Sequence, residues 1–165
     1  MISRPDFETP KATIDKLGSI SQIEYCAEIL SNSEPWITLG MTREHIKNFL
    51  IDPVSEPYLQ KVKNEVIGVV IMQMQGPFPG YIKIIAIAPN WRGKGYGRQL
   101  LEFSEERIFR DYPNVFLCVS SFNLNAQDFY QKMGYDQEGE LKDYLIEGQS
   151  EILLRKSRGP VMGYK

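Results

Sequence analysis

The sequence is poor in the residues that bind metals or cross-link a chain. Its 165 residues include two cysteines and one histidine. Cys26 falls in a helical pattern and Cys118 in a strand pattern, and neither has another cysteine or a histidine nearby at the spacing of metal ligands. We therefore expect two reduced thiols, both buried as small apolar side chains, and no metal site.

Long apolar runs and an excess of one charge are also missing. No run approaches the roughly 20 residues that a membrane-spanning helix needs, and residues 1–10 lack the apolar core of a signal peptide. The formal net charge of −2 gives no reason to expect the broad basic surface that binds nucleic acid. The sequence thus predicts a cytoplasmic protein with no membrane and no nucleic acid as partner.

Internal repeats, low-complexity tracts and linkers rich in glycine, serine or proline are absent as well. A chain of this length is sufficient for one domain with a substantial core. We expect a single domain over residues 1–165, with its core in residues 12–156 and a tail in residues 157–165.

Apolar periodicity predicts an α/β fold, a mixed sheet of about six or seven strands with about four helices on its faces. The strand patterns cover residues 12–17, 58–63, 66–75, 81–88, 115–120, 135–142 and 144–156. The helical patterns cover residues 21–31, 43–51, 96–110 and 123–132. Ser21 and Thr42 are the expected N-caps of the first two helices. The almost continuously apolar run 81–88 is typical of a strand buried on both faces.

A glycine-rich segment between the strand at 81–88 and the helix at 96–110 carries the clearest chemistry. Gly93, Gly95 and Gly97 remove side chains at alternate positions, so no Cβ blocks a ligand that approaches the backbone. The amides of this segment can converge on one anion at the helix N-terminus. Positive charge comes from Arg92, Lys94 and Arg98. The segment predicts a phosphate-bearing cofactor; the competing interpretation is a glycine-rich turn with incidental basic residues.

The segment resembles the acyl-CoA loop of the GCN5-related N-acetyltransferases. That family's pattern is Arg/Gln-x-x-Gly-x-Gly/Ala, and Arg92-Gly93-Lys94-Gly95-Tyr96-Gly97 satisfies every defined position. The spacings of the P-loop and of the dinucleotide-binding fingerprint do not fit. A second match, Asn123-x-x-Ala126-x-x-Phe129-Tyr130-x-x-Met133-Gly134-Tyr135, follows at a separation that also fits the family. Together the two segments cover roughly residues 81–136.

The resemblance implies the acetyltransferase fold and acetyl-CoA as the acyl donor. The glycine loop would hold the pyrophosphate of coenzyme A, and the strand at 81–88 would pair its backbone with the pantetheine arm. The N–H of Ile87 would stabilise the oxyanion that forms on the thioester carbonyl. The expected cofactor contacts are Ile85, Ala86, Ile87, Arg92, Gly93, Lys94, Gly95, Tyr96, Gly97, Arg98, Asn123, Ala126 and Tyr130.

The implied reaction is direct attack of a neutral primary amine on the acetyl carbonyl. Tyr130 holds the position of the family's tyrosine that protonates the leaving thiolate; the alternative is a core tyrosine beside Phe129. Asn123 would contact the pantetheine arm, cap its helix, or do both. Ser120 and Asn125 are weaker candidates for this region.

The base that takes the amine proton is left open. Some family members place a glutamate on the central strand, whereas residues 81–88 contain no acid, and Lys83 is their one ionisable group besides Tyr81. The possible bases are Glu34, His45 and Glu151. His45 lies in a helical pattern, which favours a surface position for it.

The family builds its acceptor site largely from the first two helices and the loop between them. Glu34 would hold a cationic acceptor, and Trp36 would stack on it or wall the site. The alternative is a Pro-Trp corner packed on the helices with an exposed glutamate. Phe78 is a further wall candidate. The acceptor would be a small-molecule or peptide amine, and the last strand or the tail is available to pair in a homodimer.

Two rival functions remain beside an acetyl-CoA-dependent N-acetyltransferase. The same fold could transfer a different acyl group, which the cofactor-side residues do not discriminate. A non-catalytic module could bind acyl-CoA as a sensor. Tyr130 favours an enzyme, because a sensor has no need of a proton donor at that position.

Overall fold

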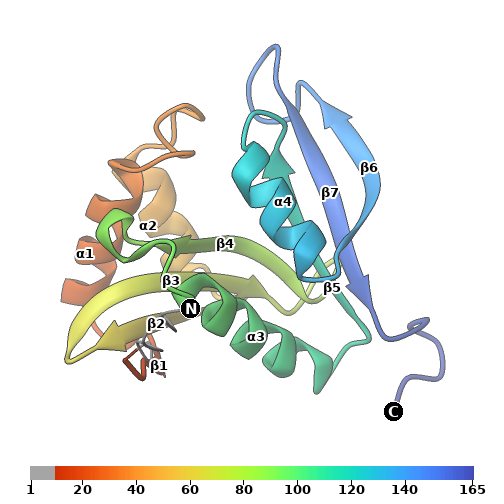
Figure 1. Ribbon diagram of the computed structural model, residues 1–165, viewed down its shortest axis with the longest axis horizontal. Helices are drawn as coiled ribbons and strands as arrows, with labels where there is room; N and C mark the ends of the chain where they lie inside the picture. Colours follow the sequence, from red (N-terminus) through yellow and green to blue (C-terminus); the bar gives the residue numbers. More distant parts are fainter. Residues whose placement is uncertain (1–9) are drawn as a thin grey trace, which may run out of the picture.

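A seven-stranded mixed sheet runs through the computed structural model in the order β1-β2-β3-β4-β5-β7-β6 (Figure 1). The strands are β1 (Thr13–Lys16), β2 (Ser55–Val62), β3 (Glu65–Gln73), β4 (Tyr81–Ile87), β5 (Asn114–Ser120), β6 (Asp136–Lys142) and β7 (Ser150–Ser157). β4 and β5 are parallel, and the other neighbours are antiparallel. The predicted mixed sheet is therefore confirmed. The structure describes residues 10–165, so the prediction that no signal peptide is present falls almost entirely outside the described residues.

The α-helices cover both faces of this sheet. They are α1 (Ile20–Ser31), α2 (Arg43–Ile51), α3 (Tyr96–Phe109) and α4 (Leu124–Lys132), and a 3-10 turn, η1 (Pro89–Trp91), precedes α3. One apolar cluster joins α1 and α2 to β2, β3 and β4, and a second joins α3 and α4 to the other face. The number of helices and their distribution over the two faces agree with the sequence prediction.

The cap of α2 was predicted correctly and the cap of α1 was not. The Thr42 hydroxyl accepts the N–H of His45, as an N-cap should. The cap of α1 is Ser19 instead of Ser21, because Ser19 is the last extended residue and its hydroxyl accepts the N–H of Gln22 at 3.3 Å. The capping-box spacing at Ser21 was a chance match within the first turn.

Several strand boundaries also differ from the prediction. β2 begins at Ser55, directly after the turn in which the Ser55 N–H donates to the Asp52 carbonyl at 2.9 Å. β7 begins at Ser150 and not at 144, because residues 143–149 form a loop in which Asp143 accepts the N–H of Gly148 at 2.6 Å. The loop matters for function, since it reaches the cavity described below.

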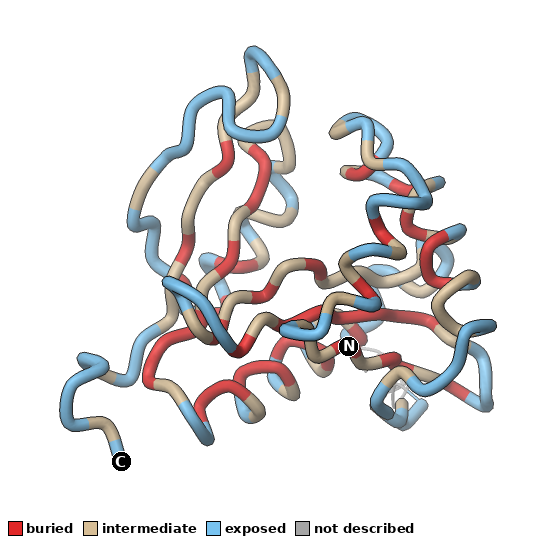
Figure 2. The backbone as a smooth tube through the Cα atoms, turned by 180° about the vertical axis from the view of Figure 1, so that it is seen from behind, coloured by how far each residue is buried: buried red, intermediate tan, exposed pale blue. Residues whose placement is uncertain are grey.

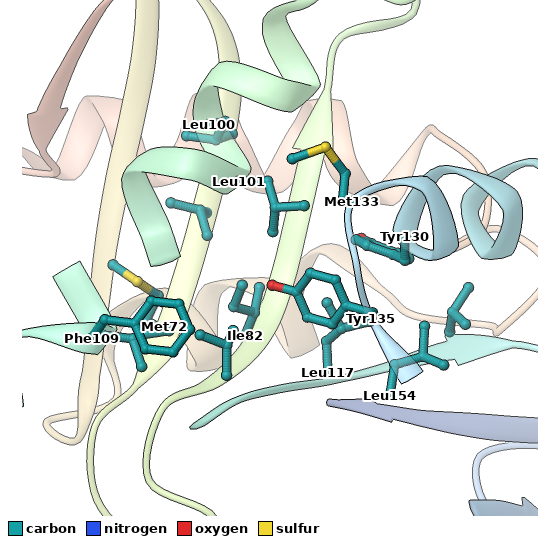
Figure 3. Packing of buried hydrophobic residues seen from close by; sticks show 14 of the residues in the cluster. Met72, Ile82, Leu100, Leu101, Phe109, Leu117, Tyr130, Met133, Tyr135 and Leu154 are labelled. Carbon is teal, nitrogen blue, oxygen red and sulfur yellow. The ribbon is translucent and has the colours of Figure 1, made fainter. Parts of the chain in front are cut away.

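The larger of the two apolar clusters lies where β3, β4 and β5 meet α3 and α4. Figure 2 shows buried backbone along the central strands and along the helix sides that face them, with exposed loops around the rim. Figure 3 shows how Tyr130 of α4 packs beside Tyr135, with their ring centroids 5.7 Å apart. Cys26 is buried and unoxidised as predicted, whereas Cys118 is also unoxidised but only partly buried. Cys118 is partly exposed because its side chain faces a cavity.

One ion pair ties α3 to the C-terminal half of the sheet, and its removal should be costly. The Lys156 ammonium of β7 lies 2.7 Å from the carboxylate of Glu105 on α3, whose side chain is 10% exposed. We expect Lys156→Met to lower the free energy of unfolding by about 2–4 kcal/mol, because it leaves a buried carboxylate without its cation. Denaturant unfolding measures this difference.

The matched control for this prediction is Lys132→Met. Lys132 pairs with Asp128 on the surface of α4, with 71% and 60% of the two side chains exposed. An exposed pair of this kind contributes at most about 0.5 kcal/mol. Equal losses in the two variants would contradict the structural role of the Glu105–Lys156 pair.

Candidate active site

The central parallel pair of the sheet comes apart after a short stretch of pairing. β4 and β5 are paired at Tyr81–Phe116 and Ile82–Leu117, and no further pairs follow. On its other edge β4 carries a bulge: Ile71 and Met72 of β3 oppose Ile84 and Ile82, so Lys83 is the extra residue. We call the point where the two strands diverge the fork. Figure 1 shows β5, β6, β7 and α4 inclined away from the rest of the sheet beyond it.

A cavity of about 150 Å³ opens at the fork, and we call it the fork cavity. Its floor is formed by β4 and β5, and its sides come from the α1–α2 connection, α2, the start of α4, β7 and the β6–β7 loop. It is lined by Pro35, Trp36, Leu39, Met41, Phe49, Tyr81, Ile82, Lys83, Ile84, Ile85, Leu117, Cys118, Val119, Ser120, Asn123, Ala126, Tyr130, Tyr144, Leu145 and Glu151.

The free edge of β4 presents backbone groups towards the fork. The N–H of Ala88 donates to the carbonyl of Ile67 on the β3 side at 2.7 Å. Because successive amides of a strand point to opposite edges, the N–H groups of Ile87 and Ile85 point to the fork, whereas that of Ala86 points to β3. Both faces of β4 are packed, as predicted, since Ile82 belongs to one apolar cluster and Ile84 to the other, but the remaining residues of this strand are only partly buried. The strand lacks a neighbour where the fork opens.

The glycine loop places unpaired amides beside this edge. Gly93 and Gly95 have φ angles of 72° and 89°, and Gly95 is the N-cap of α3. The first backbone bond of the helix runs from Gln99 to the carbonyl of Gly95 at 3.2 Å. Within residues 10–165, the amides of Tyr96, Gly97 and Arg98 have no backbone acceptor. They form the positive end of the helix dipole, where phosphate oxygens bind well.

The side chains of the loop divide into structural and exposed ones. The Tyr96 ring is buried and its hydroxyl donates to the Pro10 carbonyl at 3.2 Å, so this residue can offer a ligand only its backbone. Arg92 is partly committed, because its Nε donates to the carbonyl of Ile87 at 2.9 Å. Lys94 lies over the Trp91 ring, and the exposed Arg98 lies 3.8 Å from Glu102. Lys94 and Arg98 are the cations on the outer side of the loop.

One side of α4, together with its N-cap, faces the fork cavity. The side chain of Asn123 caps this helix by accepting the N–H of Ala126 at 3.2 Å, as one of its two interpretations predicted. Asn123, Ala126 and Tyr130 all line the cavity. Ala126 and Tyr130 are four residues apart and therefore share one side of the helix.

Tyr130 holds the position of the family's proton-donating tyrosine. Its side chain is 8% exposed and packs edge-on against Phe129 and Tyr135, yet it also lines the fork cavity. Burial raises the pKa of Tyr130 above the usual value near 10, so the hydroxyl stays protonated at neutral pH. Among the described residues, none forms a hydrogen bond with this hydroxyl. Tyr130 is therefore a core ring beside Phe129, as the alternative interpretation stated, and it also borders the cavity.

A buried carboxylate lies across the same cavity. Glu151 of β7 is directly opposite Ser120 of β5 in the sheet register, and the Ser120 hydroxyl donates to its carboxylate at 2.6 Å. Glu151 is 5% exposed. Burial raises the pKa of Glu151, and the hydrogen bond from Ser120 offsets part of that increase. The carboxylate is thus a stronger base than an exposed glutamate.

The other predicted acceptor-site residues do not come together. Trp36 is buried and lines the fork cavity, but Glu34 is exposed and its carboxylate accepts the N–H of Thr38 at 3.2 Å. His45 is exposed, and its Nδ1 accepts the Thr42 N–H at 3.2 Å as the second half of a capping box. Phe78 is 52% exposed and packs on Phe116. None of Glu34, His45 and Phe78 lines the cavity.

Several cavity residues were missed because their positions depend on the fold. Tyr144 and Leu145 reach the cavity from a loop that was predicted as strand, and Cys118 faces it from β5. Phe49 of α2 also lines the cavity, and no feature of the sequence indicates this. Only the charge of Lys83 within an apolar strand was visible in the sequence as an unusual feature.

Comparison with known proteins agrees with this architecture. Residues 21–135 match the model of the Acetyltransferase (GNAT) family. An uncharacterized N-acetyltransferase of Methanocaldococcus jannaschii is 29% identical over 108 residues, 64% of this chain and 69% of that protein. An N-alpha-acetyltransferase of Saccharolobus solfataricus is 24% identical over 164 residues, 92% of this chain and 93% of that protein.

A solved structure has the same fold. The crystal structure of a GNAT family acetyltransferase from Elizabethkingia anophelis with acetyl-CoA bound superimposes with a TM-score of 0.70 at 23% identity, over 88% of this chain and 97% of that one. The chain belongs to the GNAT acetyltransferase family. Its activity is that of an acetyl-CoA-dependent N-acetyltransferase.

The described residues were also searched for membrane-spanning helices and for groups of metal ligands. Over residues 10–165, no helix is both long enough and apolar enough to cross a membrane. The same part of the chain holds no group of three or more histidine, cysteine, aspartate or glutamate side chains that could bind a metal ion.

Proposed function

We propose that the chain transfers the acetyl group of acetyl-CoA directly to a primary amine in the fork cavity, with Tyr130 as general acid and Glu151 as general base. One observation supports this proposal above all. Tyr130, the buried Glu151 and Ile85 on the free edge of β4 line a single cavity, and Ile87 follows two residues further along the same edge. A proton donor, a proton acceptor and an oxyanion site are the three elements that aminolysis of a thioester requires.

The reaction balances with these groups. The neutral amine attacks the acetyl carbon, and the N–H of Ile87 donates to the oxyanion that forms on the carbonyl oxygen. The C–S bond then breaks, and the Tyr130 hydroxyl gives its proton to the sulfur of coenzyme A. Glu151 takes the proton that the amine nitrogen loses. The products are an N-acetylated amine and the free thiol, and solvent returns the proton of Glu151 to Tyr130.

The cofactor would lie along the free edge of β4 and end on the glycine loop. The pantetheine arm would pair with the backbone of Ile85 and Ile87, which has no strand neighbour on that side. The pyrophosphate would bind the amides of residues 95–98, with Lys94 and Arg98 beside it. Arg92 would have to share or release the Ile87 carbonyl that it now holds.

A side chain introduced at Gly95, the N-cap of α3, would strain the glycine loop and so tests the cofactor site. We expect Gly95→Ala to raise the KM for acetyl-CoA about tenfold, because a side chain in the left-handed region costs roughly 1–2 kcal/mol and the loop amides shift to relieve it. Steady-state release of the thiol measures the effect. Gly163→Ala is the matched control, since Gly163 has the same φ of 89° but lies in the tail. An unchanged KM for Gly95→Ala would contradict the assignment.

The rival functions give different results in two simple assays. Calorimetric binding of acetyl-CoA combined with thiol release over a panel of primary amines separates an enzyme from a sensor, because a sensor binds without turnover. A second series with longer acyl-CoA donors identifies the acyl group. We expect turnover with acetyl-CoA; binding without turnover of any amine would contradict the proposed function.

A further inference from the structure

Lys83 is a cation in an apolar strand that the proposed chemistry does not use. It is the extra residue of the β4 bulge, it is partly buried, and it lines the fork cavity. Its ammonium lies 4.7 Å from the centroid of the Phe49 ring. Among residues 10–165, no carboxylate lies within ion-pair distance of it. The bulge thus directs a positive charge into the acceptor side of the cavity.

The fork cavity therefore has two fixed charges of opposite sign, Lys83 and Glu151. The other ionisable groups that line it are tyrosines and Cys118, which are neutral at physiological pH. Lys83, Cys118 and Glu151 line the same cavity. Burial raises the pKa of the Cys118 thiol, so it remains protonated. The two charges act within one small space.

One part of the remaining cavity wall is apolar. Trp36, Leu39 and Met41 come from the α1–α2 connection, Phe49 from α2, and Leu145 from the β6–β7 loop. A cation facing such walls loses hydration, and the contact with the Phe49 ring does not neutralise its charge, so a ligand that supplies an anion is favoured. This balance favours an acceptor that brings its own negative charge.

We propose that the acceptor is a small amine that also carries a carboxylate, namely an amino acid with an apolar side chain. Its amine would lie towards Glu151 and the thioester, its carboxylate would pair with Lys83, and its side chain would contact the apolar walls. This inference rests on the proposed function, because it assumes that the amine reacts in the fork cavity.

The same charges disfavour two other kinds of acceptor. A polyamine would bring at least two positive charges to a cavity with one carboxylate and one fixed cation, so part of its charge would be repelled. The N-terminus of a peptide has an amide in place of the α-carboxylate and would leave Lys83 without a partner. The experiment below therefore includes a polyamine and an amino-acid amide, which represents a peptide N-terminus, as competing acceptors.

The experiment compares L-phenylalanine, L-phenylalaninamide and spermidine as acceptors, by thiol release and by calorimetric binding to the protein loaded with coenzyme A. The first two share the ring and the amine and differ in the carboxylate. The amines of the acid and the amide have different pKa values. For each protein we therefore take the ratio of kcat/KM for the acid to kcat/KM for the amide, and compare this ratio between wild type and variant. The effect of the amine pKa values is the same in both proteins and cancels.

We expect Lys83→Gln to lower this acid-to-amide ratio by about 10- to 100-fold, because hydrogen bonds to charged groups contribute roughly 1.5–3 kcal/mol. Lys83→Arg should keep most of the ratio, since it keeps the charge. Lys16→Gln, on the exposed edge strand β1, should leave it unchanged. The effect should fall mainly on the KM for the acid.

The outcomes separate the two proposals. An unchanged ratio in Lys83→Gln would overturn the acceptor inference, as would a higher kcat/KM for spermidine or for the amide than for the amino acid in wild type. Turnover of an amine that does not depend on Lys83 would support the proposed function and contradict only the acceptor inference. Binding of the amino acid that depends on Lys83, without thiol release, would instead support the acceptor site and contradict the proposed function. No binding and no turnover of the amino acid would overturn the acceptor inference.

Discussion

Tyr130→Phe should lower kcat by about 10²–10³, within the range that a positioned general acid contributes. The hydroxyl forms no hydrogen bond with any described residue, so its loss should not disturb packing, and the thermal midpoint should stay within a few degrees of wild type. The KM for acetyl-CoA should change little, because the proton is transferred only in the transition state. Steady-state thiol release at saturating acetyl-CoA measures the effect.

The matched control is Tyr135→Phe, which removes a buried hydroxyl from the ring packed against Tyr130. Tyr135 does not line the fork cavity, so its variant should keep the wild-type kcat. The pH profile adds a further check. Since burial raises the pKa of Tyr130 above its usual range, kcat of wild type should not fall as the pH rises to about 9.5. Wild-type turnover by Tyr130→Phe would exclude its role as the acid.

Glu151→Gln should produce a loss of kcat of similar size, about 10²-fold or more, together with a changed pH profile. Glu151 acts as a base only when it is ionised, so activity should fall as the pH decreases through its pKa. Burial raises that pKa above the ordinary value of 4.5, and the acidic limb should shift accordingly. In Glu151→Gln this limb should vanish, leaving only the ionisation of the acceptor amine.

Two further variants make this prediction specific. Ser120→Ala removes the hydroxyl that lowers the pKa of Glu151, so the acidic limb should move to higher pH while kcat at its plateau is largely retained. Glu140→Gln changes an exposed glutamate on the adjacent strand β6 and should have no effect. An acidic limb that survives unchanged in Glu151→Gln would assign the base to another group.

The parts of the fold that the sequence predicted well depend on local signals. The glycines at 93 and 95 adopt the positive φ angles for which glycine is suited, and α3 begins where its apolar periodicity begins. The cap at Thr42 and the helix at 124–132 are likewise determined by neighbouring residues. The position of the glycine-rich loop could therefore be predicted before the strands around it were placed.

The acceptor side of the site was harder to predict, because it depends on strand register. Glu151 was one of three possible bases, and it is distinguished from the other two only when β5 and β7 pair so that it lies opposite Ser120. Glu34 was predicted to hold the acceptor because it is an acid in the loop between the first two helices, but its carboxylate accepts the N–H of Thr38 in that loop instead. The fork exposes β4 in a way that an apolar run does not reveal, since the same run also suits a fully buried strand.

A crystal structure of the chain with coenzyme A bound would locate the cofactor relative to the glycine loop and Tyr130. We expect the diphosphate on the amides of residues 95–98 and the thiol in the fork cavity, within about 3.5 Å of the Tyr130 hydroxyl. A thiol located away from that hydroxyl, or a diphosphate bound at another surface, would contradict this expectation.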